Sequence, residues 1–224
     1  MNIFVMFRAS ARELKSPRCL TTTGILCALY IALNAYAPQF SEILKVTIGY
    51  LALAAIGMLY GPVVAVIAAI PCDIITGLLS PFPFVAAFIP SRMLEALIYG
   101  IFLYGYGSRG AGGSRGGAVW AAWQTLRIVI ARLIVVIVCY SVINTLIVIF
   151  FILQPGRAAE ILSEQSFWIY AWFRSGWLNT AKLPVDLALM FMLLPIINKA
   201  YQRASQGAGK ERKIYDNFRL HRRG

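Results

Sequence analysis

The chain has 224 residues, of which 59% are hydrophobic and 13% are charged, and its formal net charge is +12 at pH 7. A mean hydropathy of +0.71 is far too apolar for a soluble domain of this size. The apolar residues form long uniform runs instead of the alternating pattern of a membrane β-barrel, so the composition predicts an all-α, polytopic membrane protein.

Taken in chain order, the sequence divides into three parts. The N-terminal segment 1–19 mixes apolar and basic residues and is expected to be amphipathic and cytoplasmic. The basic tail 199–224 is expected to be cytoplasmic as well. Between them, residues 20–198 predict a membrane domain made of a six-transmembrane-helix bundle. Its apolar runs are 20–36, 46–60, 62–80, 85–104, 125–153 and 168–197.

The basic residues predict the orientation of this bundle. With six spans, most lysines and arginines fall on one side: before the first run, between the fourth and fifth, and after the sixth. Cytoplasmic loops retain such residues, so both termini are expected in the cytoplasm. Topology therefore accounts for the charge of +12, and no nucleic-acid binding is needed to explain the basic tail.

Asp73 is the single charged residue between Lys45 and Arg92. A carboxylate that faced lipid would cost a few kcal/mol or more, so Asp73 needs a polar partner or a water-filled cavity. Two interpretations stay open. Asp73 accepts hydrogen bonds from the N–H groups of a ligand, or it pairs with Arg92, Arg132 or Lys182.

Other charges in the apolar runs also suggest pairs. Arg92 and Glu95 are three residues apart and can meet on one helix face, and Lys182 and Asp186 have the similar spacing of four. Arg174 lies near the predicted outer end of the sixth run without a local acid. It is the best candidate to meet an anionic group from outside.

Aromatic and amide side chains add to the candidate site. The start of the sixth run is crowded with aromatic residues, which an interfacial belt explains, although a ring such as Trp172 is also suited to stack on a flat ligand. Asn144 in the fifth run is a buried amide that serves either packing or recognition.

Small residues recur along the first run. Gly24, Ala28, Ala32 and Ala35 share one helix face, which lets another helix approach closely. That helix belongs either to the same chain or to a partner subunit.

The sequence gives no support for a metal-binding, catalytic or nucleotide-binding motif. The four cysteines lack metal-binding spacing and are expected to be buried thiols, and the only histidine, His221, lies in the basic tail. The G-x-S-x-G match at 112–116 sits in a glycine-rich loop, and no P-loop is present. We therefore expect no catalytic residue, metal or cofactor, and any active transport must draw energy from another subunit or an ion gradient.

One stretch resembles a known family. The run LKVTIGYLALAAIGMLYGPVVAVIAAIPCDIITGLLSPFPF, followed by LEALIYGIFLYG, is similar to the substrate-binding (S) components of energy-coupling factor (ECF) vitamin transporters, most closely the folate-type branch. Its core is a turn at 57–62 that leads into a helix with Asp73. The resemblance covers residues 12–104 and thins afterwards, where 144–146 and 183–184 still look similar. Arg92 and Glu95 stand where the family usually has small residues.

The resemblance implies a protein of the bacterial cell membrane that captures a vitamin at its outer side, between the loops of helices 1–2, 3–4 and 5–6. It also implies docking, through Ala28 and Ala32, to a transmembrane coupling subunit that joins two cytoplasmic ATPase subunits. Reorientation of the bundle, driven by the ATPases, would then carry the vitamin inward.

The expected ligand is folate or a related pterin. Its adjacent N–H donors suit Asp73, its flat ring suits Phe82, Phe84 or Trp172, and its carboxylates suit Arg174 or Lys45. Arg92 and Asn144 complete the candidate set. Alternatives are an S component for another vitamin, such as pantothenate or a thiamin precursor, a membrane enzyme that uses Asp73 or Glu95 on lipid, and an assembly subunit without a ligand.

Overall fold

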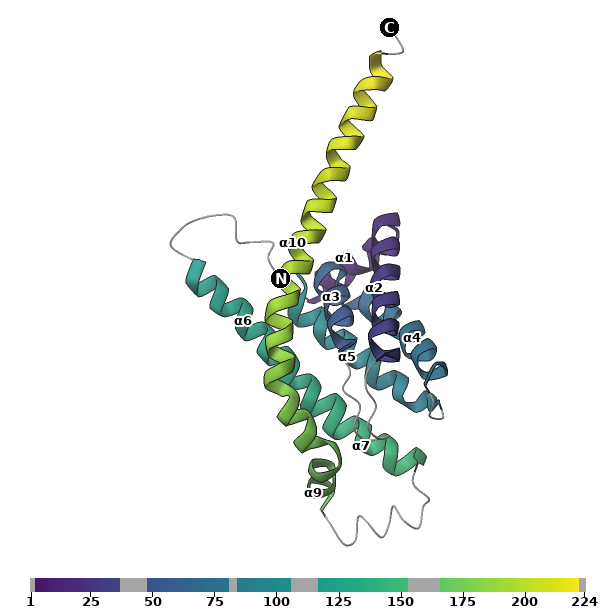
Figure 1. Cartoon of the computed structure of the whole chain (residues 1–224), viewed down its shortest axis with the longest axis vertical. Helices are drawn as coiled ribbons and strands as arrows, with labels where there is room; N and C mark the ends of the chain where they lie inside the picture. Colours follow the sequence, from purple (N-terminus) through teal and green to yellow (C-terminus); the bar gives the residue numbers. More distant parts are fainter. Residues whose placement is uncertain (1–2, 37–47, 81–83, 106–116, 153–165, 222–224) are drawn as a thin grey trace.

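The computed structural model describes residues 3–36, 48–80, 84–105, 117–152 and 166–221, and every secondary-structure element in these ranges is a helix (Figure 1). In chain order the helices are α1 (Ile3–Glu13), α2 (Pro17–Ala35), α3 (Tyr50–Tyr60), α4 (Pro62–Leu78), the 3-10 turn η1 (Ala86–Phe88), α5 (Ile89–Leu103), α6 (Gly117–Ile134), the π-helix η2 (Val135–Ile143), α7 (Asn144–Ile147), the π-helix η3 (Val148–Ile152), α9 (Phe167–Ala171), the π-helix η4 (Trp172–Gly176) and α10 (Trp177–His221). The prediction of an all-α protein is confirmed for the described residues.

Four described helical stretches are long and apolar enough to cross a membrane. They are Pro17–Ala35, Ala86–Leu103, Ala122–Phe151 and Trp177–Ala204. α3 and α4 are apolar but shorter. The fold is therefore that of a helical membrane bundle, and the count of six spans stays a prediction.

α3 forms the centre of the bundle. All of its residues except Leu59 are buried, and it packs against α2, α4, α5 and α10. A helix that other helices surround needs no polar face, which explains why its sequence is apolar all round. This burial also allows a helix of only 11 residues to form the centre of the bundle.

Glycines let α3, α4 and α5 approach each other closely. Gly61 makes the turn between α3 and α4 with φ of 86°, a conformation that favours glycine. A Cβ atom on Gly57 would lie 2.8 Å from the backbone nitrogen of Gly100, and a Cβ on Gly100 would meet the backbone of Pro62. The backbones of these three helices are therefore in direct contact.

The remaining helices are less regular. π-helical segments interrupt the helix that begins with α6 and the helix that ends with α10. α10 also contains Pro184 and Pro195, and it extends well beyond the rest of the bundle towards the C-terminus (Figure 1). These two long helices border the site described next.

Candidate functional site

Arg92, in the second turn of α5, binds two carboxylates. Its Nε lies 3.4 Å from Oδ1 of Asp73 on α4, and its Nη1 lies 2.8 Å from Oε2 of Glu95. The predicted Arg92–Glu95 pair is confirmed. Of the partners considered for Asp73 within the chain, the structure selects Arg92.

Arg132, near the end of α6, continues this arrangement deeper in the bundle. Its Nη2 lies 2.5 Å from Oδ2 of Asp186 on α10, and its Nη1 lies 3.8 Å from Oε1 of Glu95. Nη1 also donates a hydrogen bond of 2.6 Å to the hydroxyl of Tyr99. Asp186, expected to pair with Lys182 one turn away, thus has its salt bridge with Arg132 instead.

Tyrosine side chains complete the polar contacts. The Tyr140 hydroxyl donates to Oε1 of Glu95 at 2.8 Å and accepts from Nη1 of Arg92 at 3.4 Å. The guanidinium of Arg132 lies 4.0 Å from the ring centroid of Tyr50, whose hydroxyl donates to the backbone carbonyl of Asp186. A cation held against an aromatic face is stabilised further when water is excluded.

The five ionic residues form one chain of alternating sign, here called the charge network: Asp73, Arg92, Glu95, Arg132 and Asp186. It links α4, α5, α6 and α10. Taking charges out of water is costly, and such groups are tolerated when each has an opposite charge and further hydrogen bonds. The network therefore explains how so many ionisable groups are accommodated inside an apolar bundle.

The network is not equally buried along its length. The side chains of Arg132 and Glu95 are 1% exposed, whereas those of Arg92 and Asp73 are 27% and 15% exposed. The Asp73–Arg92 pair is thus the accessible end, where a ligand could exchange hydrogen bonds with the protein.

Polar oxygens without hydrogen-bond partners lie close in sequence to this accessible end. Thr76 follows Asp73 by one helical turn, and Asn144 follows Tyr140 by one turn. Within the described residues, the buried Thr76 Oγ1, Asn144 Oδ1 and Thr145 Oγ1 take part in no hydrogen bond. Buried polar groups normally have partners, so these atoms are available to a ligand or to water.

The π-helix η2 helps to position the site. It carries Tyr140, and the hydroxyl of Ser141 donates to the carbonyl of Val136, five residues earlier. The wider π turn changes the direction in which the following side chains point, and such segments are frequent at functional sites.

The structure describes the side chains of only some of the other residues predicted to bind the ligand. Phe84 is 37% exposed, and its ring lies against Gly77, one turn beyond Asp73. Trp172 is exposed in η4. Lys45 and Phe82 lie outside the described residues, and for Arg174 the structure describes only the backbone. The structure thus brings Asp73, Arg92 and Phe84 to the same end of α4.

Sequence reasoning missed part of the site. Arg132 was considered only as a possible partner of Asp73, and the tyrosines at positions 50, 99 and 140 were not singled out. Hydroxyl groups in apolar helices that also contain charged residues were the available signal.

The small-residue face of α2 points away from the bundle. Ala28 is exposed, Ala32 is partly buried, and a Cβ on Gly24 would meet no atom within 4 Å, whereas Leu26 and Tyr30 on the other side are buried. This favours the alternative in which the small residues receive a partner's helix.

The described ranges contain no group of three histidine, cysteine, aspartate or glutamate side chains that could hold an ion. The four cysteines carry free thiols, and three of them are buried.

The helical fold and the buried charge network define an integral membrane protein with a polar interior. The model of the family described as "ECF transporter, substrate-specific component" matches residues 18–194, and the chain belongs to this family. A solved structure with the same fold is titled "Crystal structure of FolT bound with folic acid". It has a TM-score of 0.56 and 17% sequence identity, and the similarity covers 80% of this chain and 93% of that chain. No curated protein matches the chain.

Proposed function

We propose that this substrate-specific component captures folate or a related pterin. The solved FolT structure, which has folic acid bound, supports this ligand class. The chemistry of the accessible end of the charge network supports it as well, because a pterin presents adjacent N–H donors and a carbonyl acceptor. Asp73 accepts from the donors, and Arg92 donates to the carbonyl.

The observation that carries the proposal is the accessible Asp73–Arg92 pair. It offers one acceptor group and one donor group side by side, 3.4 Å apart. Phe84 beyond the next turn of α4 gives the ring of a ligand an apolar surface. Asn144 supplies a further polar contact. We assign Trp172 and Phe82 to the ring of the ligand, and Arg174 and Lys45 to its carboxylate tail.

The arrangement in the membrane is part of the proposal. We assign six spans to residues 20–198, with segment 1–19 and tail 199–224 in the cytoplasm of a bacterial cell. α3 and α4 rise about 16 and 25 Å at 1.5 Å per residue, less than a hydrocarbon core of about 30 Å. Their burial against neighbouring helices supports their placement as short spans.

The outward-facing small residues suggest the docking surface. We assign Ala28 and Ala32 of α2 to contact with a transmembrane coupling subunit, which in turn joins two cytoplasmic ATPases. Exposed small residues allow close helix packing in a membrane, where dispersion contacts drive association. The protein itself is a transport component, and ATP hydrolysis belongs to its partners.

Isothermal titration of the purified full chain with folic acid tests the ligand. Asp73→Asn should weaken binding at least tenfold, because the amide nitrogen would face the donors of the pterin. Glu13→Gln, which removes an exposed carboxylate from α1, is the matched control and should bind as the unmodified chain does.

Two results would contradict this proposal. One is equal folic acid affinity of the Asp73→Asn and Glu13→Gln variants. The other is an absence of folic acid binding while mass spectrometry of the purified protein identifies a different vitamin carried through purification.

A further inference from the structure

α1 lies outside the stretch that matches the family. It ends before residue 18, where the family match begins. Ser10 fixes it to the bundle, since this residue is fully buried and its hydroxyl donates to the carbonyl of Tyr60 at 2.7 Å. The same oxygen accepts from the backbone nitrogens of Val63 and Val64. Ser10 thus joins the last turn of α3 to the first turn of α4.

The rest of α1 has the character of a helix at a membrane surface. Ile3 and Phe4 are 62% and 90% exposed. Arg8 and Arg12 are exposed as well, and Lys15 and Arg18 follow them. Helices that combine exposed apolar side chains with arginines lie in the interface between water and acyl chains, where they attract anionic lipids.

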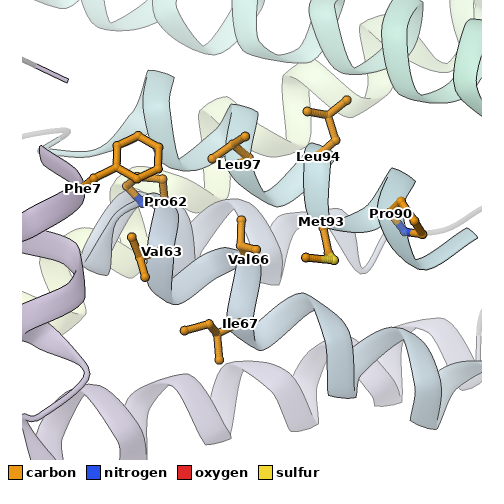
Figure 2. Close-up of a pocket in the computed structure, with 9 residues that line it drawn as sticks. All are labelled: Phe7, Pro62, Val63, Val66, Ile67, Pro90, Met93, Leu94 and Leu97. Carbon is orange, nitrogen blue, oxygen red and sulfur yellow. The ribbon is translucent and has the colours of Figure 1, made fainter. Parts of the chain in front are cut away.

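An apolar groove of about 410 Å³ runs from α1 along α4 and α5. Figure 2 shows Phe7 of α1 beside Pro62 at one end of the groove and Pro90 at the other. Val66, Ile67 and Leu97 line the length between them. The groove is open to its surroundings, and the apolar helices α4 and α5 form its walls.

We propose that this groove binds one anionic phospholipid. One acyl chain lies between α4 and α5, and the phosphate is held by Arg8 and Arg12. α1 connects the two parts, because it contributes Phe7 to the end of the groove and carries Arg8 and Arg12 as exposed residues one turn apart. Arginine is well suited to phosphate oxygens, which it binds with paired N–H donors.

Charge complementarity favours a lipid over a protein helix at this position. The partner must be apolar along α4 and α5 and negative at α1, which carries two arginines and a single glutamate, Glu13. A phospholipid of the leaflet on this side combines these properties in one molecule. A flexible acyl chain also follows a narrow groove between two helices and gains dispersion contacts along its length.

Native mass spectrometry of the detergent-purified full chain, titrated with phosphatidylglycerol and phosphatidylcholine, tests the proposal. One phosphatidylglycerol should bind about tenfold or more tightly than phosphatidylcholine. The double variant Arg8→Gln/Arg12→Gln should lose this preference. The matched control Lys199→Gln/Arg203→Gln removes the same charge from exposed positions of α10 and should keep it.

Variants of the groove test the acyl-chain site separately. Val66→Trp, or Ile67→Trp at a more exposed position, should lower the affinity for both lipids about tenfold, with an unchanged elution profile and melting temperature as evidence of folding. The proposal would be overturned if the unmodified chain bound the two lipids equally. It would also be overturned if the α1 and α10 variants lost the preference for phosphatidylglycerol to the same extent, or if both groove variants bound lipid as the unmodified chain does. A groove variant that keeps the lipid but no longer assembles with a coupling subunit would overturn it as well, because the groove would then be a protein interface.

Discussion

The helices α3 to α5 and the helices from α6 to α10 form two regions that pack differently. In the first region, glycines bring backbones into contact, and nearly all of α3 is buried. In the second, π segments interrupt the helices, and many aromatic side chains, including Trp168 and Phe173, are exposed. The first region is held together by close backbone packing, whereas the helices of the second region are less regular.

The charge network joins these regions. Asp73, Arg92 and Glu95 belong to the first, and Arg132 and Asp186 belong to the second. Apolar residues of α6 and α10, such as Ile128 and Met190, also enter the common core. The comparison teaches that the accessible Asp73–Arg92 pair belongs to the closely packed region, whereas Arg132 and Asp186, which continue the network beyond Glu95, belong to the region with π segments.

The largest expected effect comes from breaking the close packing of the first region. Gly100→Leu should abolish the folded protein, because any side chain at this position would collide with the backbone of Pro62. Size-exclusion chromatography of a fluorescent fusion measures the yield of monodisperse protein. Gly24→Leu is the matched control, since its side chain would enter open space and should leave the yield unchanged. A normal yield from Gly100→Leu would refute the role of backbone contact.

Breaking the salt bridge between Arg132 and Asp186 should have the next largest effect on stability. Arg132→Met leaves Asp186 without its salt bridge and should lower the free energy of unfolding by about 3–5 kcal/mol. Adding Asp186→Leu should recover part of this loss, because the unpaired carboxylate is then gone. Unfolding in mixed micelles measures both, with Arg203→Met at an exposed position as control. The loss of unfolding free energy in the double variant should be smaller than the sum of the losses in Arg132→Met and Asp186→Leu. A larger loss than this sum would contradict this account.

The smallest effect on stability is expected at the outward face of α2. Ala28→Trp should change the free energy of unfolding by no more than about 0.5 kcal/mol, because the position is exposed. It should nevertheless abolish assembly with the coupling subunit, measured by co-purification, while ligand binding survives. Leu29→Trp, at a neighbouring exposed position off the small-residue face, should assemble normally. Intact complex from Ala28→Trp would show that this face is not the docking surface.

Local patterns predicted much of the fold. Apolar runs located the long helices, although α2 begins at Pro17, three residues before the predicted run, because proline is favoured in the first turn of a helix. The i, i+3 spacing predicted the Arg92–Glu95 pair correctly, since helix geometry alone brings these side chains together. The stretch from the Gly57–Pro62 turn to Asp73 predicted the family, which the match over 18–194 confirms.

Contacts across the bundle were harder to predict. Arg132 and Asp186 are separated by 54 residues. Local helix spacing, which predicted the Arg92–Glu95 pair correctly, predicted Lys182 as the partner of Asp186. The burial of Ser10 was also unexpected, because a serine in an amphipathic segment gives no sign that its hydroxyl will join two other helices.

The sequence by itself determined that this is a helical membrane protein, where α3 turns into α4, and which charges lie within apolar runs. These properties follow from hydrophobicity, helix period and the special conformation of glycine, all of which act over a few residues. Only the tertiary structure decided that Arg92 holds Asp73, that Arg132 joins Glu95 to Asp186, and that the small residues of α2 face outward. Those outcomes depend on how helices far apart in the chain cross, because the direction of each side chain across the bundle selects its partner among several residues of suitable charge.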